Sequence, residues 1–204
     1  EQIFGITVNE FSNLLISNYM DMENTNTQQH FYLDGDKFKA FYETADAGNT
    51  DWRRIAEMFE VVDGASQTNV FCRKYNQKPL NSGYTYSGAN AVPLIRLPEM
   101  YYILAEANYS KDKEKALDYL NAVRGSRGLA DIEVSLVDSR DKFMKEMTRE
   151  RMREFYGEGQ MFGFYKCHNL GFRDFQDKVD IVPSKDIFVL PWPKSEQEYG
   201  VTNQ

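Results

Sequence analysis

The sequence feature that most constrains the fold is a hydrophobic stretch near the middle of the chain, Leu94-Ile-Arg-Leu-Pro-Glu-Met-Tyr-Tyr-Ile-Leu-Ala-Glu-Ala-Asn108. Pro98 suits the first turn of a helix, where its missing N–H group is not needed. After the proline, only two glutamates and one asparagine interrupt the apolar residues. A helix that is apolar on nearly every side lies inside a domain, so the stretch predicts a central helix over residues 97–109.

A second helix is predicted directly after the short polar turn Ser110-Lys-Asp-Lys. Asp112 is a typical N-cap residue, and either Gly125 or Gly128 ends the helix. Its apolar face consists of Ala116, Leu117, Leu120 and Val123. Two helices joined by so few residues lie antiparallel, so the centre of the chain predicts a helical hairpin. The hairpin has roughly tetratricopeptide size, and the sequence contains no second copy of it.

Shorter elements are predicted on both sides of the hairpin. Extended segments are expected over residues 2–8, 70–75 and 186–190, and a short helix capped by Asp51 over residues 51–59. The segment 11–19 fits strand or helix, residues 21–50 are polar and rich in turns, and residues 76–90 form a long loop. A third helix begins after Asp138 or Ser139, and its apolar face consists of Phe143, Met144, Met147, Met152, Phe155 and Tyr156. Residues 161–167 are expected to continue as helix.

Charge and composition exclude several classes of partner. The net charge is −7, and no run of five or more Lys or Arg residues occurs, which argues against nucleic acid and anionic membrane surfaces. No apolar run approaches the ~18 residues of a membrane span. Cys72 and Cys167 do not form a disulfide framework. Glu1-Gln-Ile-Phe4 lacks the features of a signal peptide, so we interpret the chain as the interior of a longer one.

Motifs for cofactor and metal chemistry are missing from the sequence. Neither a phosphate-binding loop nor a dinucleotide fingerprint occurs, and no serine lies in a nucleophile elbow. His30 and His168 lack the glutamates of a di-metal carboxylate site. Asp34-Gly-Asp36 could bind calcium through oxygen ligands, but the pattern is more typical of a solvated turn. We therefore predict no catalytic residue, no cofactor and no metal.

Two sets of charged residues on predicted helices have competing interpretations. Glu150 and Glu154 lie one helical turn apart, as a glycosidase carboxylate pair could, but neighbouring arginines favour a structural role. Glu106 lies in an otherwise apolar helix, and a buried glutamate needs a partner. Arg124 on the second helix is the natural candidate, so we predict a structural polar pair between Glu106 and Arg124.

Taken together, several motifs resemble the SusD/RagB family signature. Arg96-Leu-Pro-Glu-Met-Tyr-Tyr-Ile-Leu-Ala-Glu-Ala107 is similar to the first signature helix, and Ala116-Leu-Asp-Tyr-Leu-Asn-Ala-Val-Arg124 to the second. Glu150-Arg-Met-Arg-Glu154 and Glu158-Gly159 resemble the family's following helix, and Phe188-Val-Leu-Pro-Trp-Pro-Lys-Ser-Glu196 resembles its closing segment. The similarity covers essentially the whole chain, in the family's order.

The resemblance implies a fold, a location and a function. It implies a mainly α, SusD-like fold, with a tetratricopeptide-like hairpin and a loop-rich lobe that has a few short strands. The corresponding parts are a ligand-binding lobe over 1–92, the hairpin and following helices over 93–170, and a C-terminal loop and short strand over 171–204. The family's members are non-catalytic, lipid-anchored proteins of the outer-membrane surface. They bind glycans or peptides and deliver them to a SusC-like TonB-dependent transporter, and their lipid anchor would be absent from this chain.

Candidate ligand-binding residues follow from chemistry, because sugar rings stack on exposed aromatic rings. The candidates lie in the polar segments of the lobe: Trp52, Tyr84, Tyr86, Tyr32 and Tyr42, with Asn81 and Asn90 as hydrogen-bonding neighbours. Two alternatives remain open, a helical adaptor that binds a protein without a small ligand, and a carbohydrate-active enzyme that uses Glu150 and Glu154.

Overall fold

The structure, a computed structural model, describes residues 1–8, 32–42, 50–54, 58–63, 68–74, 91–173 and 179–193. The chain divides into two compact units, Glu1–Gly157 and Glu158–Gln204. The segment 11–19 and the loop 76–90, for which we made predictions, lie outside the described residues. The division of the chain at residues 92 and 170 remains a prediction.

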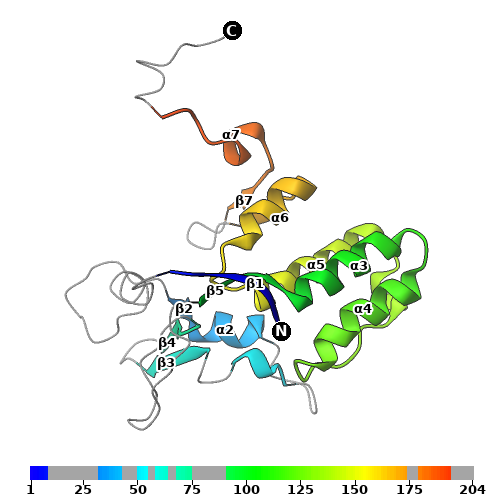
Figure 1. The fold of residues 1–204 in the computed structure, drawn as a ribbon, viewed down its shortest axis with the longest axis horizontal. Coiled ribbons are helices and arrows are strands. Elements are labelled where there is room, and N and C mark those ends of the chain that lie inside the picture. Colours follow the sequence, from blue (N-terminus) through cyan, green and yellow to red (C-terminus); the bar gives the residue numbers. More distant parts are fainter. Residues whose placement is uncertain are drawn as a thin grey trace, which may run out of the picture. The chain divides into compact units, whose positions relative to one another are not determined.

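The first unit is mainly helical with a few short strands, as predicted (Figure 1). In chain order its described elements are β1 (Gln2–Thr7), β2 (Leu33–Asp34), α2 (Gly35–Phe41), the 3-10 turn η2 (Trp52–Arg54), β3 (Phe59–Asp63), β4 (Thr68–Cys72), β5 (Ala91–Arg96), α3 (Leu97–Tyr109), α4 (Lys113–Gly125), the 3-10 turn η3 (Val134–Val137) and α5 (Arg140–Glu154). None of the helices in the described part of the chain combines the length and hydrophobicity needed to span a bilayer.

The predicted helical hairpin is confirmed as α3 and α4. The first turn of α3 contains Pro98, and the Asp112 carboxylate caps α4 by accepting a hydrogen bond from the Lys115 N–H at 3.0 Å. The rings of Tyr101 and Tyr119 meet with their centroids 6.3 Å apart. Because these two residues lie at similar distances from the connecting turn, their contact fits the antiparallel arrangement.

Helix α5 completes the apolar core of the hairpin. The Ser139 hydroxyl caps it by accepting a hydrogen bond from the Lys142 N–H at 3.3 Å, which confirms the predicted start. The rings of Phe143 and Tyr109 stack with centroids 4.1 Å apart. The buried apolar residues of the three helices are Tyr102, Ala105, Tyr109, Ala116, Leu117, Leu120, Val123, Phe143, Met144 and Met147.

A small three-stranded antiparallel sheet, in the order β2–β4–β3, forms the second part of this unit. Helix α2 packs against it, and the rings of Phe38, Tyr42 and Phe59 form a hydrophobic cluster with Val70, which we call the aromatic cluster. The Asp34 carboxylate caps α2 by accepting hydrogen bonds from the N–H groups of Asp36 and Lys37, both at 3.1 Å. The predicted strand over 70–75 corresponds to β4. For residues 35–41 the sequence predicted only turns, because seven residues are too few to show a clear helical period.

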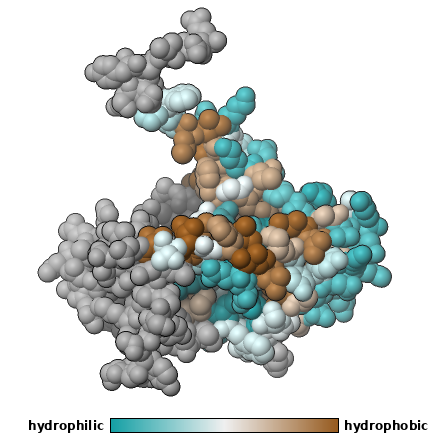
Figure 2. All heavy atoms as spheres, viewed as in Figure 1, coloured by the Kyte–Doolittle hydropathy of each residue, from teal (hydrophilic) through white to brown (hydrophobic). Residues whose placement is uncertain are grey.

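The central helix α3 is less buried than we predicted. Ile103 and Leu104 are exposed, and so are Ile3 and Phe4 on β1. Figure 2 shows hydrophobic residues gathered along β1, which pairs antiparallel with β5. The apolar composition of residues 97–109 therefore predicted a helix correctly. It did not predict that one part of the α3 surface is exposed.

The second unit contains α6 (Gln160–His168), β6 (Phe172–Arg173), β7 (Asp180–Ile181) and α7 (Lys185–Phe188). Helix α6 confirms the helical prediction for residues 161–167. The prediction of a strand over 186–190 is wrong, because α7 occupies most of it. Four β-prone residues are too few to distinguish a strand from a single helical turn, and Ser184 precedes the run in an extended N-cap conformation.

The predicted helix over 51–59 in the first unit is also corrected at its end. Phe59 begins the strand β3 rather than ending a helix.

Candidate functional site

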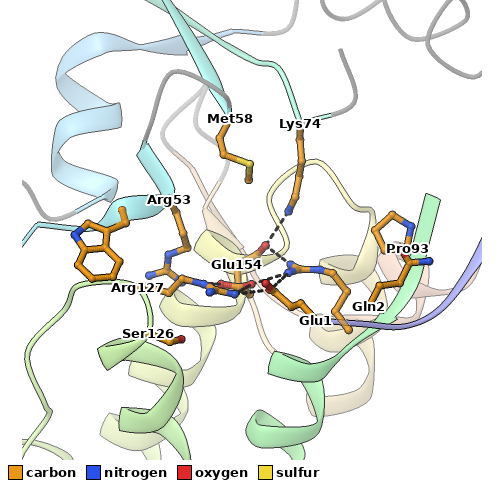
Figure 3. A pocket seen from close by; sticks show the side chains of 11 residues that line it. Glu1, Gln2, Arg53, Met58, Lys74, Pro93, Ser126, Arg127 and Glu154 are labelled. Carbon is orange, nitrogen blue, oxygen red and sulfur yellow. Dashed lines mark hydrogen bonds and ion pairs between the residues drawn. The ribbon is translucent and has the colours of Figure 1, made fainter. Parts of the chain in front are cut away.

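A pocket of about 520 Å³ opens among the first residues of β1, η2, β5 and the C-terminal ends of α4 and α5 (Figure 3). Apolar side chains and arginines share its wall. The lining residues are Glu1, Gln2, Trp52, Arg53, Met58, Lys74, Pro93, Arg96, Ser126, Arg127 and Glu154. They come from segments that are distant in sequence, so the pocket exists only in the folded unit.

Glu154, the last residue of α5, is the centre of the pocket's charged floor. Its carboxylate accepts a hydrogen bond from Arg96 Nη1 at 2.7 Å and two from Arg127, at 2.8 Å to Nη2 and 3.0 Å to Nε. Its backbone carbonyl accepts further hydrogen bonds from Arg96 Nη2 at 2.6 Å and Lys74 Nζ at 2.9 Å. Figure 3 shows these groups converging on Glu154 from different elements.

Glu150 forms a second, deeper centre one turn earlier on α5. Its carboxylate accepts hydrogen bonds from Arg124 Nη1 at 2.5 Å and Arg153 Nη1 at 2.9 Å. Arg53 links the two centres, since its Nη2 lies 3.1 Å from Glu150 Oε2 and its Nη1 lies 3.4 Å from Glu154 Oε2. Arg53 also makes a bidentate pair with Asp51, at 2.8 and 2.7 Å. The ion-pair cluster is defined here as the following residues: Arg53, Lys74, Arg96, Arg124, Arg127 and Arg153 with Glu1, Asp51, Glu150 and Glu154.

The cluster keeps the Glu154 carboxyl ionised. Burial by itself would raise the pKa of this group, but the hydrogen bond from Arg127 and the charges of Arg127, Arg96 and Arg53 lower it from the ordinary 4.5 to about 2. The hydrogen bond to Glu154 in turn raises the pKa of the Arg127 guanidinium. A carboxylate held ionised in this way is a structural anion and a poor general acid.

The sequence contains a signal for the burial of the two glutamates. Phe143, Met147, Glu150 and Glu154 follow one another at helical spacings of four, three and four residues. The two glutamates therefore lie on the same face of α5 as its buried apolar residues. The structural interpretation of Glu150 and Glu154 is supported, but the cations include residues from η2 and β5 that α5 alone could not identify.

Trp52, one of the predicted ligand-binding residues, lines the pocket and is 58% exposed. Its backbone N–H donates a hydrogen bond to the Arg127 carbonyl at 2.8 Å, which fixes η2 against the end of α4. Gly128 allows this close approach. It has a φ of +78°, and a Cβ atom there would lie 2.5 Å from both Trp52 Nε1 and the Thr50 carbonyl oxygen.

The other predicted aromatic residues have different positions. Tyr32 is exposed next to Phe71, with ring centroids 5.9 Å apart, and does not line this pocket. Tyr42 is only 1% exposed, and its hydroxyl donates a hydrogen bond to the Arg153 carbonyl at 3.2 Å. Our expectation that Tyr42 is an exposed loop residue is thus corrected, because it follows α2 and packs into the aromatic cluster. Tyr84 and Tyr86, with Asn81 and Asn90, lie outside the described residues.

Glu106 and Arg124, predicted as a structural pair, each have another ion-pair partner. Glu106 lies 3.8 Å from Arg140 at the start of α5, whereas Arg124 binds Glu150. Arg124 is in the last turn of α4, far from the connection between the helices, and Glu106 is close to that connection. Antiparallel helices place such residues at different heights, which explains why the prediction chose the wrong partner for each.

The pocket combines apolar and cationic surfaces. Its apolar surfaces come from Trp52, Met58 and Pro93, and its polar surface comes mainly from guanidinium groups. Within the described ranges, no group of three or more His, Cys, Asp or Glu residues is arranged to hold a metal ion.

Comparisons with known proteins identify the family. A model of the SusD family matches residues 15–163, which is more than half of the chain. No curated protein matches the sequence.

Two crystal structures from Bacteroides vulgatus ATCC 8482 have a similar fold. One is a SusD-like carbohydrate binding protein, with 20% identity and a TM-score of 0.58 over 82% of this chain and 40% of that one. The other is a SusD superfamily protein, with 22% identity and a TM-score of 0.58 over 78% of this chain and 36% of that one. The chain thus spans about two-fifths of the length of these relatives. By its sequence and its fold, the chain belongs to the SusD family.

Proposed function

We propose that this protein binds glycans without catalysis at the cell surface and passes them to a TonB-dependent outer-membrane transporter. Support comes from membership of the SusD family and from the fold shared with a SusD-like carbohydrate binding protein. In this proposal a lipid anchor outside the present sequence holds the protein at the membrane, and peptides are the second ligand class.

The observation that carries the proposal is the position of Trp52. Its exposed indole ring is the aromatic group among the described lining residues, and the guanidinium groups that share the lining can donate hydrogen bonds to hydroxyl groups. Sugar rings present C–H faces to aromatic rings and hydroxyl groups to polar neighbours. One ring stacked on Trp52 would therefore satisfy both kinds of contact.

The state of the carboxylates supports binding over glycoside hydrolysis. A hydrolase requires a protonated carboxylic acid near neutral pH, as well as a second carboxylate that is available to the substrate. Glu154 has a pKa of about 2, and its oxygens accept hydrogen bonds from three arginines. Glu150 is fully buried beneath it.

The chain contains two tryptophans, which allows a direct test. In a Trp192→Phe variant, Trp52 is the single tryptophan, and we expect its fluorescence to change as neutral oligosaccharides from a plant-glycan panel are added. Trp52→Ala should weaken binding of the same oligosaccharides by roughly tenfold, since one sugar–aromatic contact contributes about 1–1.5 kcal/mol. Calorimetry would measure both affinities.

Trp192→Ala is the matched control, because Trp192 is also exposed but belongs to the unit Glu158–Gln204. Tight binding that leaves the emission of Trp52 unchanged would remove this pocket from the proposal. Copurification of the lipid-anchored, full-length protein with a transporter would test the delivery step separately.

A further inference from the structure

The pocket carries an excess of positive charge in a chain that is acidic overall. Among the described residues of the ion-pair cluster, the cationic side chains outnumber the anionic ones by six to four: Arg53, Lys74, Arg96, Arg124, Arg127 and Arg153 against Glu1, Asp51, Glu150 and Glu154. The whole chain has a net charge of −7. An anion is therefore repelled by the chain as a whole and attracted at this pocket.

Arg127 presents part of this charge to the pocket. Its side chain is 19% exposed, compared with 2% for Glu154 beneath it. Within the described part of the chain, its contacts engage Nε and Nη2 and leave Nη1 for a ligand. A guanidinium group can bind a carboxylate or a sulfate through two nitrogens.

Glu1 occupies the place that a ligand anion would take. One oxygen of its carboxylate lies 2.9 Å from Arg96 Nη1 and 2.5 Å from Arg127 Nη2. Glu1 is 49% exposed, whereas Glu154 and Glu150 are buried. Exposed ion pairs contribute about 0–1 kcal/mol, so an incoming anion can replace Glu1 and leave the buried pairs intact.

We propose that this pocket selects acidic glycans, in which a uronic acid carboxylate or a sulfate ester binds Arg127 and Arg96 in place of the Glu1 side chain while the sugar ring stacks on Trp52. The inference rests on the proposed glycan-binding function and adds the substrate class. The two acidic groups share the same chemistry, a planar or tetrahedral oxyanion that accepts hydrogen bonds from guanidinium groups.

Matched pairs of oligosaccharides test the selection by calorimetry. Oligogalacturonate is compared with its methyl ester, and a chondroitin sulfate oligosaccharide with its desulfated form. We expect the charged member of at least one pair to bind more tightly, and the preferred pair distinguishes carboxylate from sulfate. The preference should weaken between 0.05 and 1 M NaCl, since the Debye length falls to about 3 Å at 1 M salt.

Two variants should change the affinity for the charged oligosaccharide in opposite directions. Glu1→Gln removes the competing carboxylate and should tighten binding roughly two- to fivefold. Arg127→Gln removes the exposed guanidinium group and should weaken binding about tenfold or more. A general loss of structure cannot produce the gain expected for Glu1→Gln. Arg149→Gln is the control, because it removes an exposed α5 arginine that pairs with Glu146 outside the pocket.

The outcomes separate this inference from the proposed function. Equal affinity for the charged and neutral members of both pairs, with both lost in Trp52→Ala, would overturn the acidic selection and retain glycan binding. A charged preference that Glu1→Gln and Arg127→Gln both leave unchanged would place the anion elsewhere and also overturn the inference. Failure of every oligosaccharide to bind would overturn the proposed function together with the inference.

Discussion

The helical hairpin and the ion-pair cluster are neighbouring regions that bury their side chains by opposite means. Between α3, α4 and α5 the buried residues are almost all apolar, as Leu120 and Phe143 illustrate. At the ends of α4 and α5 the buried residues are charged, and each carboxylate needs several arginines. Apolar burial tolerates small errors of geometry, whereas buried charge requires every partner. The comparison teaches that the candidate site depends on buried charge, which places stricter demands on geometry than apolar burial does.

The largest effect is expected for Glu150→Ala. The substitution leaves Arg53, Arg124 and Arg153 without the carboxylate that they share, and an uncompensated buried charge costs roughly 3–5 kcal/mol. Urea denaturation should show this loss in the free energy of unfolding. Glu146→Ala, on the same helix but paired with Arg149, is the control and should cost less than about 1 kcal/mol. Equal losses in the two variants would contradict a special role for the cluster.

Leu120→Ala tests the hairpin by the same measurement. Leu120 is fully buried in α4, and truncation of a buried leucine costs about 3 kcal/mol through lost transfer energy and a cavity. This loss should be the same at pH 3 and pH 7, because no titrating group is involved. A pH-dependent loss would show that the hairpin core and the cluster are coupled.

The pattern of successes in sequence-based prediction follows the same division. The correct predictions depend on residues that are close in sequence. They are the bounds of α3 and α4, the caps Asp112 and Ser139, and the apolar face of α4. The cluster depends on Arg53 and Arg96, which reach Glu154 across 101 and 58 residues. Hydrophobic periodicity carries no information about contacts between such distant residues. Of the predicted aromatic residues that the structure describes, Trp52, Tyr32 and Tyr42, only Trp52 lines the pocket. Helical spacing could have shown that Glu150 and Glu154 are buried, but it could not have identified most of their partners.

Acidification should affect the cluster and spare the hairpin. The pKa of Glu154 is about 2 in the folded protein, below its ordinary value of 4.5, so the folded state favours the ionised form. Its contribution of about 2–3 kcal/mol is therefore complete above pH 4.5 and is lost as the pH falls towards 2. Denaturation between pH 2 and pH 7 would measure it. In Glu154→Gln the corresponding part of the pH dependence should disappear, and an unchanged profile would contradict the assignment.

The last prediction concerns the support of Trp52. Gly128→Ala places a methyl group at a positive φ, 2.5 Å from both the Thr50 carbonyl oxygen and Trp52 Nε1. We expect the positive φ to cost roughly 1–2 kcal/mol, and the contacts to displace the indole ring. In the Trp192→Phe background, the fluorescence of Trp52 should report this displacement. Gly125→Ala is the matched control, because nothing lies within 4 Å of a Cβ atom at Gly125 and its helical conformation suits alanine.

The position of Glu150 and Glu154 on the packing face of α5 also affects the order in which the first unit folds. The α3–α4 hairpin is made of local contacts, which form early because they close short loops. Helix α5 packs against the hairpin without a large desolvation penalty only after η2 and β5 have placed Arg53 and Arg96 beside its glutamates. Docking that occurs too early would bury carboxylates with only part of their counter-charge. The cluster thus disfavours a helical intermediate that lacks the lobe, and we expect Glu1–Gly157 to fold in a single cooperative transition.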